Sequence, residues 1–131
     1  MEVFVYGTLT DPDRAETVLE EFSFEGAATL VGLRRVRGRY PTLAPPTADD
    51  ESSVEGRVLA TPDVAALDAY EGVASGLYVR TTVPATDGRG SVYVGDPDLL
   101  GAPADWPGEG PFAGRVEQYV ERTPVSVRRD G

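Results

Sequence analysis

A carboxylate at the end of a predicted helix is the side chain in this sequence best suited to proton transfer. The stretch 61–72 begins with an N-cap threonine and a proline suited to the first turn, and it ends with a glycine, so it predicts a helix over 62–71. Val64, Leu67 and Glu71 share one face of this helix. Burial and the C-terminal end of the helix dipole would both raise the pKa of Glu71 toward the range useful for acid–base catalysis. Alternatively, the helix frays and Glu71 reaches water.

The backbone near the N-terminus offers a second kind of chemistry. Residues Glu2–Tyr6 read as an apolar strand that runs directly into Gly7, where a missing Cβ lets the chain turn and lets a ligand approach. The turn Tyr6-Gly7-Thr8-Leu9 would expose successive N–H groups, which can bind an anion. An ordinary first strand followed by an ordinary turn would have the same sequence.

Composition excludes many other kinds of active site. The chain has no His, Cys or Lys, and all twelve basic residues are Arg. Nucleophilic Ser-His and Cys-His pairs, lysine Schiff bases, tetrahedral Cys/His zinc sites and phosphate loops with their lysine are therefore excluded. Proton transfer must fall to Asp, Glu, Tyr or water.

Five short motifs occur in order between Met1 and about Val94. They are Phe4-Val5-Tyr6-Gly7-Thr8-Leu9, Tyr40-Pro41, Glu55-Gly56-Arg57-Val58, Leu67-Asp68-Ala69-Tyr70-Glu71-Gly72 and Tyr78-Val79-Arg80. Each is weak alone, but their order and spacing resemble the gamma-glutamyl cyclotransferase-like superfamily, and most closely its small gamma-glutamylamine cyclotransferase-like branch. Beyond Val94 the resemblance is limited to a Trp and a Tyr near the end.

The resemblance implies a transferase-type enzyme that releases 5-oxoproline from a gamma-glutamyl amine or dipeptide, gamma-glutamylcysteine being one possibility. The substrate's own α-amine would attack its side-chain carbonyl, and Glu71 would act as base and then as acid. The Tyr6-Gly7-Thr8-Leu9 turn would donate N–H groups to the substrate carboxylate or to the developing oxyanion. Tyr40 and Tyr78 would line the pocket. The resemblance implies no cofactor and no metal.

Several residues have a plain structural reading beside the functional one. Tyr40 with Pro41 could be a buried aromatic on an ordinary turn, and Arg80 is expected to pair with a carboxylate. Asp68 and Glu71 could bind a cation together, as could the run Asp49-Asp50-Glu51, but solvated acidic residues explain both. Tyr119 matches a C-terminal tyrosine of the resembled family and equally suits helix packing.

The predicted elements describe an α+β chain with a curled, mostly antiparallel or mixed, barrel-like sheet and a few short helices. Strands are expected over Glu2–Tyr6, 26–34, 55–60, 77–83 and 91–94, with a hairpin turn at 87–90 and an acidic loop at 45–53. Helices are expected from Asp11 to about Phe22, over 62–71, and around Phe112, Val116 and Val120. The segment 101–111 is either a connection or a flap over a pocket.

Length and charge bound the remaining possibilities. The 131 residues suit a single domain over 1–131, and neither a signal peptide nor a membrane-spanning run is visible. A cytoplasmic location fits the lack of Cys. The net charge of −10 argues against nucleic acid and anionic membranes as partners. The acidic excess favours a halophilic source, although a G+C-rich genome would explain the absence of Lys, Asn and Ile.

Three functions remain open from the sequence. The first is a gamma-glutamyl cyclotransferase, and the second is a binding module that keeps the same pocket for a gamma-glutamyl or other small acidic metabolite without turnover. The third is a structural or interaction protein, which would bind no small molecule saturably. Retention of Glu71 favours the enzyme, since a binder of anions gains nothing from another carboxylate in its pocket. The leaving amine and the oligomeric state are left undetermined.

Overall fold

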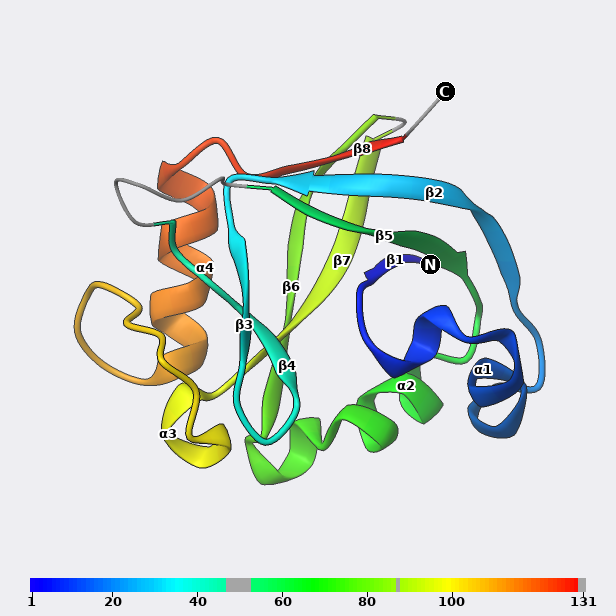
Figure 1. Ribbon diagram of the computed structural model, residues 1–131, viewed down its shortest axis with the longest axis horizontal. Coiled ribbons are helices and arrows are strands. Elements are labelled where there is room, and N and C mark those ends of the chain that lie inside the picture. The colour runs from blue at the N-terminus through cyan, green and yellow to red at the C-terminus, as the bar shows by residue number, and fades with distance from the viewer. Residues whose placement is uncertain (47–52, 87, 130–131) are drawn as a thin grey trace.

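A closed barrel of six strands forms the centre of the molecule (Figure 1). The computed structural model describes residues 1–46, 53–86 and 88–129. In barrel order, the strands are β1 (Glu2–Val5), β5 (Ser53–Ala60), β2 (Ser23–Val31), β8 (Ser126–Arg129), β6 (Tyr78–Ala85) and β7 (Gly88–Gly95). A separate two-stranded sheet, β3 (Arg34–Arg37) and β4 (Pro41–Ala44), crosses in front of the barrel in Figure 1.

Most strand pairs are antiparallel, as the short predicted connections required. The exceptions are β1 with β7 and β6 with β8, which pair in parallel. The contact of β1 with β7 closes the barrel and places the N-terminal strand beside a strand from the second half of the chain. The expected α+β fold with a curled, barrel-like sheet is therefore confirmed.

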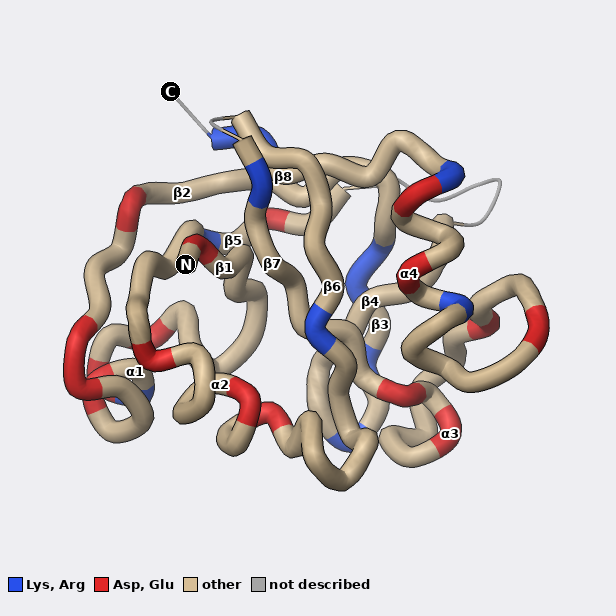
Figure 2. Tube along the Cα trace, turned by 180° about the vertical axis from the view of Figure 1, so that it is seen from behind, with Lys and Arg blue, Asp and Glu red and all other residues tan. Residues whose placement is uncertain are grey.

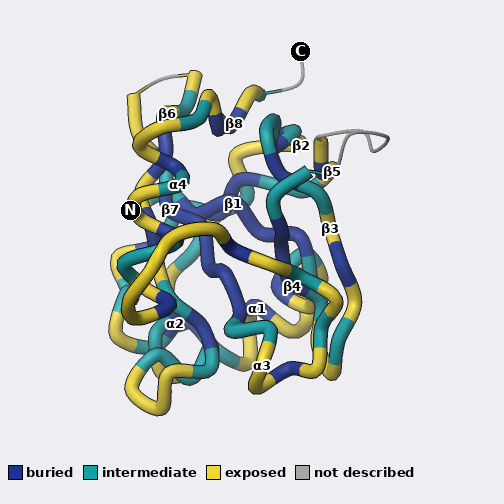
Figure 3. Tube along the Cα trace, turned by 90° about the vertical axis from the view of Figure 1, so that its left-hand side faces the viewer, coloured by how far each residue is buried: buried dark blue, intermediate teal, exposed yellow. Residues whose placement is uncertain are grey.

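Strand β1 is buried on both sides, which explains its continuous apolar sequence. Phe4 and Tyr6 point into one core cluster with strands from around the barrel. Val3 and Val5 alternate to the other side, where they join a second cluster that includes Leu67. The strand thus lies between the barrel interior and the helices that cover its outer face (Figure 3).

Four helices complete the described fold. They are α1 (Pro12–Val18), α2 (Val64–Glu71), α3 (Pro97–Leu100) and α4 (Phe112–Arg122), and short 3-10 turns follow β1 at Thr8–Thr10 and α2 at Val73–Ser75. In α4 the buried residues are Phe112, Val116 and Val120, which confirms the predicted amphipathic helix. No helix in the described ranges is both long and apolar enough to cross a bilayer.

The first two helices are shorter than predicted. α1 ends at Val18 rather than near Phe22 because Leu19 is extended and buries its side chain. α2 begins at Val64 rather than at Pro62. The hydroxyl of Thr61 donates to the carbonyl oxygen of Glu21 and also accepts the N–H of Asp63, so it ties the helix start to the preceding loop.

Strand boundaries differ from expectation in three places. The expected strand over 26–34 is divided by a turn between β2 and β3, with Gly32 at a φ of +102°. The predicted hairpin turn at 87–90 lies largely within β7, which pairs with β6 as far as Gly88. Strands β4 and β8 were not predicted. Within the expected loop 45–53, residues 47–52 lie outside the described part and Ser53 already belongs to β5.

Gly56 occupies a position in β5 that only glycine fits. A Cβ at this residue would lie 2.3 Å from the carbonyl oxygen of Val5 and 2.7 Å from the ring of Phe4. The absence of a side chain lets β5 pack closely against β1 next to the aromatic ring. This contact sets the position of the strand that leads into the Tyr6–Leu9 turn.

Candidate functional site

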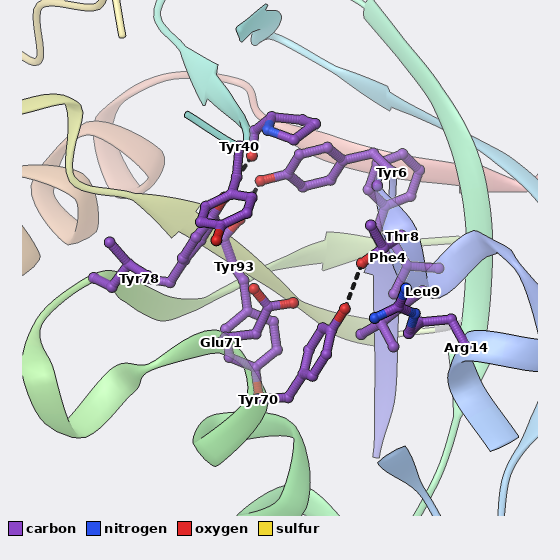
Figure 4. A pocket seen from close by; sticks show the side chains of 14 residues that line it. Phe4, Tyr6, Thr8, Leu9, Arg14, Tyr40, Tyr70, Glu71, Tyr78 and Tyr93 are labelled. Carbon is purple, nitrogen blue, oxygen red and sulfur yellow. Dashed lines mark hydrogen bonds between the residues drawn. The ribbon is translucent and has the colours of Figure 1, made fainter. Parts of the chain in front are cut away.

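A pocket of about 440 Å³ opens where β1 ends and where α2 ends (Figure 4). Residues of β1 and the following turn form one side, and Glu71 with Tyr70 comes from the last turn of α2. Tyr40 and Pro41 reach the pocket from the β3–β4 hairpin. The remaining lining residues are Arg14 of α1 and Leu77, Tyr78 and Tyr93 around β6 and β7.

Glu71 is the acidic side chain of this pocket. Helix α2 continues to Glu71 and stops because Gly72 takes a left-handed conformation, with φ of 70° and ψ of 36°. The alternative that the helix frays before Glu71 is therefore wrong. The carboxylate forms no hydrogen bond or ion pair with any described residue, and burial raises its pKa from 4.5 to about 7.

Three tyrosines hold fixed positions around the carboxylate. The Tyr6 hydroxyl donates to the carbonyl oxygen of Tyr93 at 2.6 Å, and the Tyr78 hydroxyl donates to the carbonyl oxygen of Pro41 at 2.6 Å. Burial raises the pKa of each of these tyrosines, Tyr93 included, and the nearby Glu71 raises it further. They therefore stay neutral near pH 7 and act as rigid walls with their hydroxyls already engaged.

The turn after β1 is a 3-10 turn whose first N–H groups have no partner among the described residues. The N–H of Thr10 donates to the carbonyl oxygen of Gly7 at 3.1 Å, and Arg57 braces the turn by donating to the carbonyl oxygen of Thr10 at 2.9 Å. No hydrogen bond within the described ranges uses the N–H of Thr8 or Leu9. The space that a Cβ would occupy at Gly7 is empty to 4 Å. Two amides and open space therefore border the pocket here.

The structure brings all the residues predicted for the site into one pocket. Glu71, Tyr40, Tyr78 and the four residues of the Tyr6–Leu9 turn all line it. Tyr40 is 49% exposed, so the reading of it as a buried aromatic is wrong. Arg14, Tyr70 and Tyr93 were missed as pocket residues. Tyr70 had a visible signal, since it directly precedes Glu71, whereas Arg14 had none because nothing in the sequence places α1 beside the turn.

Contacts from both sides fix the last turn of α2. Asp68, one turn before Glu71, accepts a hydrogen bond from the Tyr93 hydroxyl at 2.6 Å. It also forms an ion pair with Arg80 at 3.3 Å. Arg80 thus has the structural role that was expected of it. The hydroxyls of Tyr70 and Thr8 are 2.7 Å apart and join α2 to the turn at the pocket (Figure 4). These bonds hold the backbone that carries Glu71.

Acidic residues near the pocket do not gather into a cation site. Asp68 is occupied by Arg80 and Tyr93, and the described part of the chain contains no group of three or more side chains able to hold a metal ion. The Asp49-Asp50-Glu51 run, the other cation candidate, lies outside the described residues. The segment 101–111 is not among the pocket-lining residues that the structure describes, and its Trp106 is buried against Phe112 and Tyr119 instead.

Comparison with known proteins assigns the chain to a family. Residues 3–107 match the family described as Gamma-glutamyl cyclotransferase, AIG2-like. The chain belongs to the gamma-glutamyl cyclotransferase, AIG2-like family. This confirms the superfamily that the five motifs suggested. Family and fold together indicate a gamma-glutamyl cyclotransferase-like protein.

Individual members of the family show how far the likeness extends. AIG2-like protein A of Arabidopsis thaliana is 38% identical over 87 residues, which are 62% of this chain and 49% of that protein. The chain thus spans about half the length of this curated relative. A solution structure of another Arabidopsis thaliana protein is 30% identical, with a TM-score of 0.54 over 92% of this chain and 83% of that one.

A solved structure titled Gamma-glutamyl cyclotransferase shares the fold. Its TM-score is 0.60 at 20% identity, over 73% of this chain and 66% of that one. At this identity the likeness concerns the fold alone.

Proposed function

We propose that this chain is a gamma-glutamyl cyclotransferase in which Glu71 moves the protons. The substrate is a gamma-glutamyl amine or dipeptide, and the products are 5-oxoproline and the released amine. The observation that carries the proposal is the carboxylate of Glu71, which lies in the pocket without a partner among the described residues and whose pKa is raised to about 7 by burial. A carboxyl group with a pKa near the working pH is suited to accept and return a proton.

The reaction needs no water and no second substrate. The α-amino nitrogen forms a bond to the substrate's own side-chain carbonyl carbon, and the bond from that carbon to the leaving nitrogen breaks. Glu71 takes a proton from the attacking amine and gives it to the leaving amine, so protons balance over the cycle. Because nucleophile and electrophile belong to one molecule, the pocket must mainly hold the substrate in a folded shape.

The turn after β1 would stabilise the negative charge of the substrate or of the transition state. The N–H groups of Thr8 and Leu9 have no partner in the described part of the chain, and the open space at Gly7 lets a ligand approach the backbone. Tyr6, Tyr40 and Tyr78 would form the walls that keep the substrate folded. Burial raises the pKa of Tyr6 and Tyr78 further from pH 7, whereas it brings the pKa of Glu71 to about 7.

The proposal is tested by 5-oxoproline release from a panel of gamma-glutamyl amines and dipeptides. We expect release by the wild type and a loss of about 10²–10⁴-fold in kcat for Glu71→Gln, the range typical of acid–base catalysis. Glu117→Gln is the matched control, because Glu117 is exposed on α4 and does not line the pocket. It should keep wild-type activity.

Two outcomes would contradict the proposal in different ways. Equal turnover by the wild type and Glu71→Gln would remove Glu71 from the mechanism. No release from any compound, by protein with a cooperative melt, would favour the binding module. In that case the same panel, titrated by calorimetry, would identify compounds that bind without reacting.

A further inference from the structure

The pocket carries one basic side chain among its described lining residues, and the proposed mechanism gives it no role. This residue is Arg14 of α1, which lines the pocket together with Glu71. In Figure 4 the guanidinium of Arg14 reaches from α1 to the edge of the pocket beside Leu9 and the hydrogen-bonded pair of Thr8 and Tyr70. A cationic donor group therefore stands next to the turn that is proposed to bind negative charge.

Arg14 differs from neighbouring arginines in having no partner within the described part of the chain. Arg57 donates to the carbonyl oxygen of Thr10 and packs on the ring of Phe24, and Arg80 pairs with Asp68. The guanidinium of Arg14 makes no hydrogen bond or ion pair with a described residue. In a chain of 22 acidic and 12 basic residues, an arginine that lies beside a pocket and has no carboxylate partner among the described residues has its donors available for a ligand.

The helix that carries Arg14 is anchored on both sides of it. Asp11 caps α1 by accepting the N–H of Asp13 at 3.0 Å. The next residue, Ala15, is fully buried, and Leu19 packs into the outer core cluster. Beyond the helix, the carboxylate of Asp63 accepts the N–H groups of residues 20 and 21, which ties this end of α1 to the start of α2. The backbone at Arg14 is thus held relative to the helix that carries Glu71.

We propose that Arg14 binds a carboxylate of the gamma-glutamyl ligand and thereby helps to set substrate preference. A planar guanidinium recognises a carboxylate through two parallel N–H···O bonds, which fix orientation as well as charge. This inference rests on the proposed function, since it takes the ligand to be a gamma-glutamyl compound. Two carboxylates could occupy the position: the α-carboxylate of the glutamyl part, or a carboxylate on the leaving amine.

Binding measured without turnover tests the inference separately from the reaction. Gamma-glutamyl-alanine carries both carboxylates, whereas gamma-glutamyl-propylamide carries only the glutamyl one. Both are titrated by calorimetry into Glu71→Gln protein with and without Arg14→Gln. Arg122→Gln, an exposed arginine on α4 away from the pocket, is the control. Melting curves confirm that each variant is folded.

We expect Arg14→Gln to weaken binding by about 10–100-fold, the usual range for a hydrogen bond to a charged group. If only the affinity for gamma-glutamyl-alanine falls, Arg14 binds the carboxylate of the leaving amine. If the affinities for both compounds fall equally, Arg14 binds the glutamyl carboxylate. Arg14→Lys should restore part of the affinity. Arg122→Gln should bind both compounds as the reference protein does.

Unchanged affinity for both compounds in Arg14→Gln overturns the inference, even if the wild type releases 5-oxoproline. Conversely, the wild type could release no 5-oxoproline while binding still depends on Arg14. That result would support the carboxylate site and contradict the proposed reaction. Failure of the reference protein to bind either compound overturns both.

Discussion

At the scale of single residues, the pocket separates groups that can exchange a proton near neutral pH from groups that cannot. Burial acts in the same direction on Glu71 and on Tyr6, Tyr78 and Tyr93, because it raises the pKa of each. The effect of burial differs because the ordinary pKa values differ. The pKa of a carboxyl group rises toward neutral pH, whereas the pKa of a phenol rises further above it. The proposed acid–base role of Glu71 thus rests on its raised pKa as well as on its position in the pocket.

The pH dependence of turnover follows from this shift. Glu71 must be ionised to accept the first proton, so kcat/KM should rise with pH through a midpoint of about 7. The measurement is initial 5-oxoproline release from pH 5 to 9 at substrate concentrations well below KM. A midpoint near 4.5 would mean that Glu71 is not the group that limits the rate.

Glu71 also makes a prediction about stability that does not depend on activity. Its folded-state pKa of about 7 exceeds its ordinary value of 4.5, so the folded protein favours the protonated form and loses stability as pH rises between these values. Glu71→Gln has no such loss and should be more stable than the wild type by about 1–3 kcal/mol at pH 8. The two proteins should unfold alike near pH 4 in denaturant titrations. A Gln variant that is less stable at pH 8 would contradict the buried carboxylate.

At the scale of elements, the site depends on how α2 is fixed against the barrel. Asp68 joins α2 to β6 through Arg80 and to β7 through Tyr93. Replacing it with Asn removes the ion pair and weakens the hydrogen bond. We expect kcat to fall several-fold with little change in KM, and stability to fall by about 1 kcal/mol or less, since the pair is partly exposed. Asp98→Asn on α3 is the matched control and should change neither quantity.

The tight contact between β5 and β1 gives a second prediction at this scale. Gly56→Ala places a methyl group against the carbonyl oxygen of Val5 and the ring of Phe4, so one strand must move. We expect Gly56→Ala to lower the free energy of unfolding by at least about 2 kcal/mol, toward the upper end of overpacking effects. Gly114→Ala is the control, because a Cβ there meets nothing within 4 Å and lies inside α4. Gly114→Ala should raise the free energy of unfolding by up to about 1 kcal/mol, because alanine favours helix more than glycine does. Equal melting temperatures for the two variants would contradict the packing.

Elements with a strong periodic pattern could be predicted from the sequence, and elements defined by tertiary pairing could not. The spacing of Phe112, Val116 and Val120 identified α4, and the cap and stop signals identified α2 to within two residues at its start. The short strands β3, β4 and β8 have four residues each, too few to show alternation. β8 pairs with β2 and β6, which lie far away in the chain, so no local pattern contains this pairing. β3 and β4 pair with each other across a short turn, but neither strand is long enough to reveal the hairpin.

The same distinction explains which site residues could be predicted. Glu71 and the Tyr6–Leu9 turn belong to motifs that can be recognised in the sequence alone. Arg14 enters the pocket because α1 is anchored beside the turn by Asp63 and Leu19, contacts that span distant parts of the chain. Composition could exclude other chemistries, but it could not place a particular arginine at a particular pocket.

At the scale of the whole molecule, charge is distributed unevenly between helices and strands. Acidic residues lie on all four helices, while arginines lie on strands that include β3, β6 and β7 (Figure 2). Among the described residues, Arg80 pairs with Asp68 and Arg129 pairs with Glu2. Even with every arginine paired, the excess of carboxylates leaves a net charge of −10, which repels itself across the surface.

This self-repulsion makes stability depend on salt. The screening length falls from about 10 Å at 0.1 M to about 3 Å at 1 M, which removes most repulsion between surface carboxylates. We expect 2 M potassium chloride to stabilise the protein by about 1–2 kcal/mol relative to 0.1 M, or several degrees in Tm.

A variant in which the exposed Glu16, Glu117 and Glu121 become Gln should melt at a higher temperature in 0.1 M salt, and its Tm should respond less to added salt. If both proteins respond equally, the salt acts through general hydration and not through charge. If neither responds, the acidic surface is no adaptation to high salt, and genome composition becomes the better account of a chain without lysine.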